Sequence, residues 1–166
     1  MDENKPTIYL DYDGVLHDDD VVIINSVPAM VTPGRALFEW APILDALFAD
    51  YPAVQIILST SWATAFGCDE AAAFLPSSLQ SRVVGAIWHK DTGAYASGNY
   101  PRGVAVCTDA DQRRLTNWFA IDNDDTGWPT QYREKLLKTD DRLGLSDEAL
   151  SISLFMMLEI LTCSGS

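Results

Sequence analysis

The sequence predicts an α/β fold with three layers, in which a parallel sheet is covered by helices on both faces. Three short runs, 8–10, 54–58 and 118–121, are almost entirely apolar, which is typical of strands buried on both faces. Segments with apolar residues at helical spacing lie between these runs. Strands that alternate with helices indicate a parallel sheet, because each strand must return through a crossover helix.

The first half of the chain holds two of these strands and two helical segments. An acidic segment containing glycine ends the strand at residues 8–10. Residues 33–50 carry apolar side chains at helical spacing, and Pro42 predicts a break or kink inside this helix. Residues 54–58 form the second strand. We expect a helix over 69–75 that ends at the following proline.

The second half repeats the alternation. Residues 83–88 are a candidate third strand, and 104–117 form a helix that is polar on one side. The buried strand 118–121 follows, and 134–138 is a candidate edge strand. A strongly apolar helix over 146–163 ends the pattern, and its first residue, a serine, can cap it.

Composition bounds the class of protein. The 166 residues fit a single domain over 1–166. Apolar residues make up 48% and charged residues 21%, which excludes wholesale disorder. The net charge of −13 argues against a free nucleic-acid-binding module, because neutralising phosphates requires a surplus of Lys and Arg.

The cysteines and the lengths of the apolar runs indicate the cellular compartment. Cys68, Cys107 and Cys163 are widely spaced and form no CxxC pair, which excludes a disulfide framework or a zinc site and suits a reducing cytosol. No apolar run approaches the length of a membrane span, and the polar N-terminus lacks the features of a signal peptide. We therefore expect a cytoplasmic protein without membrane contact.

Short polar clusters follow three of the strands, at residues 11–13, 59–61 and 122–124. In open α/β sheets, functional sites lie at the carboxyl ends of the strands. The three clusters are therefore expected to meet in one crevice.

The segment 10–16, Leu-Asp-Tyr-Asp-Gly-Val-Leu, carries the sharpest functional pattern. Asp11, at the end of a buried strand, is placed to act as a covalent nucleophile, and Asp13 is placed for proton transfer to a leaving group. Crowding and a metal ion can give the two carboxyls different protonation states. The alternative is an acidic turn after a strand, since two aspartates separated by one residue are common.

This segment resembles the first motif of the haloacid dehalogenase-like (HAD) superfamily. Residues 56–62 resemble its second motif, a strand that ends in Thr or Ser, and 119–124 resemble its fourth, a strand that ends in acidic residues. The resemblance covers about residues 6–160 and implies a Rossmann-like sheet. The first two motifs, with Leu143-Gly144-Leu145-Ser146, are also similar to a poorly characterised subgroup, some of whose members accompany RNA-repair proteins.

The resemblance implies a Mg²⁺-dependent phosphohydrolase that cleaves a phosphomonoester through an aspartyl-phosphate. Asp11 would be the nucleophile and a metal ligand, and Asp13 would be the general acid/base and offer its main-chain carbonyl to the metal. Asp122 would complete the metal site, with Asn123 or Asp124 in an outer shell. Mg²⁺ favours oxygen ligands and keeps several waters, so few protein groups suffice.

Phosphate binding requires a hydroxyl and a cation. Ser59, Thr60 and Ser61 can each donate a hydroxyl, and we favour Thr60, followed by Ser61, over a simple turn or helix cap. The family's basic residue has two candidates, Arg102 and Lys90, and either can instead be a surface charge. We favour Arg102, which precedes the helix that leads into strand 118–121.

Other assignments compete for several of these residues. Asp122, Asp124, Thr126 and Gly127 fit the first half of an EF-hand calcium loop, but Arg133 stands where the last ligand, a Glu, belongs. A solvated acidic loop is a further alternative.

Three aromatic side chains near the motifs have both a functional and a purely structural interpretation. His17 either lines the pocket or is a satisfied loop residue. Trp62 and Trp128 either line the wall of the site or simply pack.

A non-enzymatic function is a further alternative: a scaffold that keeps the acidic site and binds a phosphorylated partner. This alternative stays open because the sequence holds no unambiguous match to the family's basic residue.

Access and partners follow from chain length and charge. Only 45 residues separate Asp13 from Ser59, and a helix uses many of them, so we expect a minimal cap or none and an open site. Small phosphorylated substrates rank first. Nucleic-acid ends rank second, because a surface of charge −13 repels polyanions. The final helix is expected in the core, with a homodimer contact as the alternative.

Overall fold

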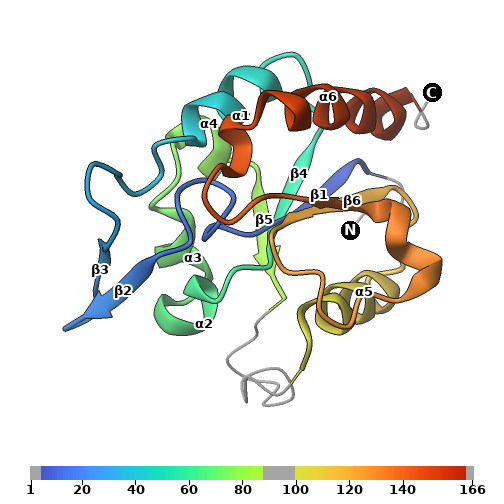
Figure 1. Cartoon of the computed structure of the whole chain (residues 1–166). Coiled ribbons are helices and arrows are strands. Elements are labelled where there is room, and N and C mark those ends of the chain that lie inside the picture. The colour runs from blue at the N-terminus through green and yellow to red at the C-terminus, as the bar shows by residue number, and fades with distance from the viewer. Residues whose placement is uncertain (1–4, 88–99, 164–166) are drawn as a thin grey trace.

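The computed structural model describes residues 5–87 and 100–163 and contains a five-stranded parallel sheet (Figure 1). Its strands are β1 (Thr7–Leu10), β4 (Gln55–Leu58), β5 (Val83–Ala86), β6 (Trp118–Asp122) and β7 (Leu136–Lys138). Their order, β5-β4-β1-β6-β7, places β1 in the middle and the expected edge strand, β7, at one end. The sheet confirms the predicted α/β fold.

The register of the sheet aligns the carboxyl ends of its central strands. Leu10 of β1 pairs with Leu58 of β4 and with Ile121 of β6. The Asp11 N–H donates to the Ile121 carbonyl at 3.1 Å, and the Ser59 N–H donates to the Leu10 carbonyl at 2.9 Å. The polar residues at the carboxyl ends of the three strands therefore lie side by side, as the sequence predicts.

Helices cover both faces of the sheet. α1 (Ala41–Phe48) and α6 (Glu148–Cys163) lie on one face and α5 (Arg102–Gln112) on the other (Figure 1). Leu10 packs in the core cluster shared with α1 and α6, whereas Tyr9 packs in the cluster shared with α5. Because successive side chains of a strand point to opposite faces, both faces of β1 are apolar.

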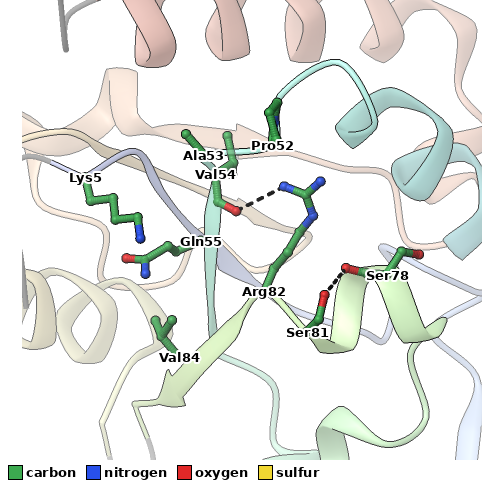
Figure 2. Close-up of a pocket in the computed structure, with 9 residues that line it drawn as sticks. All are labelled: Lys5, Pro52, Ala53, Val54, Gln55, Ser78, Ser81, Arg82 and Val84. Carbon is green, nitrogen blue, oxygen red and sulfur yellow. Dashed lines mark hydrogen bonds between the residues drawn. The ribbon is translucent and has the colours of Figure 1, made fainter.

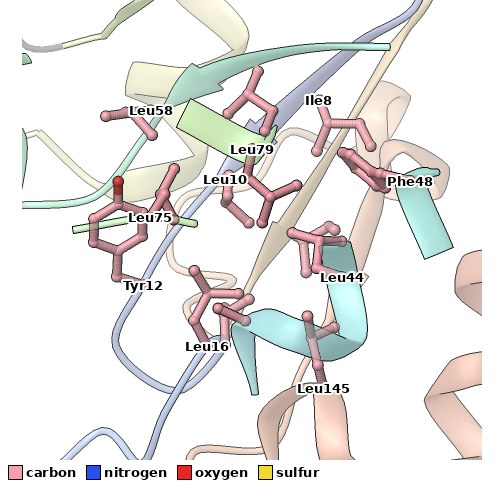
Figure 3. Packing of buried hydrophobic residues seen from close by; sticks show 14 of the residues in the cluster. Ile8, Leu10, Tyr12, Leu16, Leu44, Phe48, Leu58, Leu75, Leu79 and Leu145 are labelled. Atoms are coloured by element: carbon pink, nitrogen blue, oxygen red, sulfur yellow. The ribbon is translucent and has the colours of Figure 1, made fainter. Parts of the chain in front are cut away.

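The larger core cluster fixes α1 against β1. Leu44 and Phe48 of α1 are fully buried with Ile8 and Leu10 of β1 (Figure 3). Each such side chain contributes about 1.5–3 kcal/mol through burial. The first acidic motif therefore starts from the most firmly packed strand of the sheet.

The helical segments differ from expectation in their boundaries. Residues 33–40 form turns, and Pro42 lies in the first turn of α1, where no helical N–H is lost. The predicted kink is therefore wrong, because the proline starts the helix. The predicted helix over 104–117 is α5, which begins earlier and ends at Gln112. Asp147, and not Ser146, caps α6, since its Oδ1 accepts the Ala149 N–H at 2.9 Å.

The helix predicted over 69–75 is α3 (Cys68–Ala72), which begins one residue earlier and ends earlier than expected. Two short helices that the sequence did not predict flank it, α2 (Trp62–Phe66) and α4 (Ser77–Gln80). Two further turns are 3-10 helices, η1 (Thr130–Lys135) and η2 (Gly144–Ser146). In the described parts of the chain, no helix is long and apolar enough to cross a membrane.

A two-stranded hairpin stands apart from the main sheet. β2 (Val21–Ile24) and β3 (Val27–Met30) pair antiparallel and project outward (Figure 1). Asn25 and Ser26 between them both have positive φ, as the tight hairpin turn requires. The sequence does not predict this hairpin, because its strands are short and its turn lacks the Asn-Gly or Asp-Gly pattern. It is the only secondary structure described between β1 and α1, in accord with a minimal cap.

One face of α6 packs into the core and another faces outward. Leu154, Leu158 and Leu161 are buried, whereas Ile152 and Ile160 are 68% and 67% exposed. The homodimer contact through this helix stays a prediction.

Gly103 is required by the packing of α5. A Cβ at this position would lie 2.4 Å from the Trp128 Cα, so Gly103→Ala should lower the free energy of unfolding by about 3 kcal/mol. Gly34→Ala is the matched control: its Cβ would meet no atom within 4 Å, and its φ of +79° costs about 1 kcal/mol of backbone strain. Urea unfolding measures both, and an equal loss would contradict the packing of α5 against Trp128.

Candidate active site

The three polar clusters open into one cavity of about 470 Å³ at the carboxyl end of the sheet. Asp11 comes from the first cluster, Ser61 from the second, and Asn123 and Asp124 from the third. The full set of lining residues is Asp11, Asp13, Asp19, Ser61, Arg102, Asn123, Asp124 and Asp141.

Gly14 lets the chain turn away directly after the first motif. Its φ is +69°, and a Cβ there would lie 2.4 Å from the Asn123 side chain. The Thr139 hydroxyl donates to the Gly14 carbonyl at 2.7 Å. The turn after Asp13 is thus fitted closely against the third cluster.

Arg102 lies between two buried carboxylates of the site. Its Nη2 is 3.6 Å from Asp11 Oδ2, and its Nε is 3.5 Å from Asp122 Oδ2. Asp11 and Asp122 are 2% and 0% exposed. The structure therefore brings Arg102 to the site by placing it at the start of α5, while the alternative, Lys90, lies outside the described residues.

The two buried carboxyls are costly to ionise. Burial raises the pKa of Asp11 above its ordinary value, Arg102 opposes this rise, and the neighbouring Asp13 adds to it. Burial raises the pKa of Asp122 still further, and the charge of Asp11 adds to that rise. One guanidinium thus faces two carboxylates and leaves a surplus negative charge.

The surplus charge fits a divalent cation. Asp11 Oδ1 and Asp122 Oδ2 are buried and accept no hydrogen bond. Among the described residues no cluster of three or more His, Cys, Asp or Glu is placed to hold a metal ion. The donor set is thus two carboxylates with room for main-chain and water oxygens, which suits Mg²⁺ because this ion keeps several waters.

Asp13 is held by two aromatic side chains that the sequence analysis did not connect with it. The Trp62 indole N–H lies 3.0 Å from both carboxylate oxygens, and His17 Nε2 lies 3.0 Å from Oδ1. His17 and Trp62 are buried and do not line the cavity, whereas the Asp13 side chain is 23% exposed. The position of His17 four residues after Asp13 is the one hint that the sequence offers.

The hydroxyl cluster divides into an inner and an outer part. Ser61 lines the cavity and is exposed, whereas Thr60 is buried beneath it. The Thr60 Oγ1 accepts the Trp62 N–H at 3.3 Å, and a hydrogen bond from Thr60 lowers the pKa of Asp11. Of the two favoured hydroxyls, Ser61 is the one that an incoming ligand meets first.

The third cluster does not form an EF-hand. A strand, β6, precedes Asp122, whereas an EF-hand needs a helix there. Asp122 Oδ1 accepts the Asp124 N–H at 2.9 Å, and Asp124 Oδ1 accepts the Thr126 N–H at 2.8 Å. These carboxylates bind their own loop, which does not support the calcium alternative.

Trp128 belongs to the packing and not to the wall of the site. It is 7% exposed and lies in the core cluster shared with α5. Its indole N–H donates to the Tyr132 carbonyl at 2.7 Å.

A second cavity, of about 380 Å³, lies at the opposite, amino ends of the strands (Figure 2). Arg82 crosses it and donates to the main-chain carbonyls of Tyr51 and Phe48, at 2.8 and 2.9 Å. These carbonyls lie at the end of α1, so the Arg82 cation stabilises a helix terminus. Arg82 is therefore engaged with the main chain in this cavity.

Comparison with known proteins gives one family match. A family model described as "HAD domain in Swiss Army Knife RNA repair proteins" matches residues 7–150. No curated protein and no solved structure gives a significant match. The matched range contains every residue that lines the cavity.

Proposed function

The chain belongs to the family of HAD domains in Swiss Army Knife RNA repair proteins, and from this membership we propose a Mg²⁺-dependent phosphohydrolase that cleaves a phosphomonoester through an aspartyl-phosphate. The observation that carries the proposal is the pair of buried carboxylates, Asp11 and Asp122, beside Arg102. Each has an oxygen without a hydrogen-bond partner. A buried oxygen that lacks a hydrogen bond lowers the stability of the fold. Two such oxygens in one site therefore indicate a function for the site.

The first half-reaction uses Asp11 and Asp13. An Asp11 carboxylate oxygen attacks the phosphorus of the substrate and forms the aspartyl-phosphate, while the bond from phosphorus to the ester oxygen breaks. Asp13 gives its proton to the leaving oxygen, which departs as an alcohol. Arg102 and Ser61 bind phosphoryl oxygens. Mg²⁺, held by Asp11 and Asp122 with the Asp13 carbonyl, would neutralise phosphoryl charge when bound.

The second half-reaction returns the enzyme to its starting state. The Asp13 carboxylate takes a proton from a water molecule, whose oxygen attacks the phosphorus. The bond between phosphorus and Asp11 breaks, which releases inorganic phosphate and restores the Asp11 carboxylate. The proton on Asp13 is then ready for the next substrate.

A screen of phosphomonoesters with and without Mg²⁺ tests this proposal. Phosphate release should stop when EDTA is added and return with Mg²⁺. Undiminished turnover in the presence of chelator would contradict the metal requirement. Binding of phosphate without turnover of any ester would favour the alternative of a non-enzymatic scaffold.

Two observations point to different substrates. Asp19, Asp124 and Asp141 line the cavity, and their charge disfavours polyanions and favours small phosphomonoesters. The family's RNA-repair description favours the phosphorylated ends of RNA. Turnover of a nucleoside monophosphate should exceed that of an end-phosphorylated oligonucleotide, most clearly at low salt. An oligonucleotide preference of tenfold at all salt concentrations would reverse this ranking.

A further inference from the structure

Two buried N–H groups converge on the carboxylate of Asp13. The Trp62 indole N–H is shared between Oδ1 and Oδ2, and His17 Nε2 approaches Oδ1 alone. Oδ1 is therefore close to two donors, whereas Oδ2 is close only to the one that the two oxygens share. The carboxylate is fixed in orientation from the protein side, while its own side chain reaches the cavity.

The hydrogen bonds of His17 fix its tautomer. The Phe38 main-chain N–H donates to His17 Nδ1 at 3.1 Å. A ring nitrogen that accepts a hydrogen bond carries no proton, so in the neutral ring the proton is on Nε2. Nε2 then donates to Asp13. The Phe38 N–H and the Asp13 carboxylate thus hold the two ring nitrogens in different roles, one as acceptor and one as donor.

Phe38 is held in a strained conformation to make this contact. Its φ is +57°, which is a costly left-handed geometry for a bulky residue. Its ring packs edge-on against Tyr12, His17 and Trp62, with centroids 5.0, 4.8 and 5.3 Å away. Strain that the surroundings maintain next to a reactive carboxylate indicates a functional constraint.

We propose that His17 and Trp62 are positioning residues for Asp13, which occupy its Oδ1 and leave Oδ2 to carry the proton to and from the cavity. This inference rests on the proposed phosphohydrolase function. In the first half-reaction the Oδ2 proton moves to the ester oxygen as its bond to phosphorus breaks. In the second, Oδ2 takes a proton from the attacking water. Neither His17 nor Trp62 gains or loses a proton.

Two substrates with different leaving groups separate this role from packing. An alkyl phosphate such as glycerol 2-phosphate needs its leaving oxygen protonated, whereas p-nitrophenyl phosphate hardly does. Trp62→Phe, which keeps a ring and removes the N–H, should lower kcat on the alkyl phosphate about tenfold and change kcat on p-nitrophenyl phosphate less than about twofold. His17→Leu should do the same, and His17→Gln, which restores an N–H, should recover part of the loss.

Phe74→Leu is the matched control. The centroid of the Phe74 ring lies 5.0 Å from that of the Trp62 ring, and a phenylalanine side chain has no N–H to donate to Asp13. The variant Phe74→Leu should leave the ratio of the two kcat values unchanged. Equal losses on both substrates in Trp62→Phe would overturn the positioning role while leaving the phosphohydrolase intact. A wild-type chain inactive on both substrates would instead overturn the proposed function.

The tautomer gives a readout that needs no activity and no variant of His17. The chain has two histidines, so in His89→Gln the only histidine ¹⁵N signals are those of His17. We expect a protonated Nε2 and an unprotonated Nδ1. The opposite tautomer would overturn the proposal even if every His17 or Trp62 variant failed to fold.

Discussion

Asp11→Asn should reduce turnover by more than about a thousandfold on every phosphomonoester, because an amide oxygen is a far weaker nucleophile than a carboxylate. The fold should survive the change. Asp11 and Asp122 repel each other in a buried site, so removing one charge relieves that repulsion. Phosphate release and the thermal unfolding midpoint, measured on the same sample, check both halves of this expectation.

Asp141→Asn is the matched control for this variant. Asp141 lines the same cavity, and its Oδ1 accepts the Asn123 side-chain N–H at 3.0 Å. It should retain most of the wild-type turnover. If Asp11→Asn stayed as active as this control, Asp11 would not be the nucleophile, and a water molecule activated elsewhere would have to attack the phosphorus.

Asp122→Asn should make the metal-free protein more stable and weaken its response to Mg²⁺. Asp11, Asp122 and Arg102 carry two negative charges and one positive charge, and the variant leaves a matched pair. Asp122 Oδ2 accepts no hydrogen bond, and a buried acceptor left in this way costs about 1–3 kcal/mol, so a gain of this order is expected near neutral pH. The same variant should demand more Mg²⁺ for turnover.

The pH dependence has a definite sign. The pKa of Asp122 is raised in the folded state, so between an aspartate's usual pKa and this raised value the folded chain binds more protons than the unfolded chain. The free energy of unfolding of the metal-free wild type should therefore fall as pH rises through that window. Asp122→Asn should flatten this part of the profile.

Denaturant unfolding across pH, with and without Mg²⁺, measures these effects. Mg²⁺ should stabilise the wild type by about 2.7 kcal/mol when its free concentration is about 100 times its dissociation constant. Mg²⁺ should stabilise Asp141→Asn to a similar extent and Asp122→Asn hardly at all. Equal stabilisation of all three proteins would place the metal away from Asp122.

The sheet was predictable because burial leaves a simple pattern. A strand covered on both faces must be apolar throughout, so Ile8, Tyr9 and Leu10 indicate it without help from the rest of the chain. Pro42 was misjudged because a proline suits the first turn of a helix as well as it breaks the interior, and only packing decides between these. The exposed hairpin could not be predicted in this way, because it is not buried in the core.

The predictable part of the candidate site is the part that the strands carry. Asp11 and Asp122 follow neighbouring parallel strands, so the register of the sheet brings them together. Arg102 was favoured over Lys90 only by its place before the helix, because sequence spacing does not show which cation reaches the buried carboxylates. The joint approach of His17 and Trp62 to Asp13 depends on side-chain directions set by the aromatic cluster, which no sequence spacing expresses.

The position of β1 has a consequence for biosynthesis. β1 is the central strand, yet its partner β6 is made late: Thr7 pairs with Trp118, 111 residues further along the chain. Closing so long a loop is slow, because its entropy is lost before the pairing is gained. Until β6 has left the ribosome, β1 keeps an open apolar edge and Asp11 has no Asp122 beside it. A nascent chain therefore exposes an aggregation-prone strand before it can bind the ligand that would stabilise it.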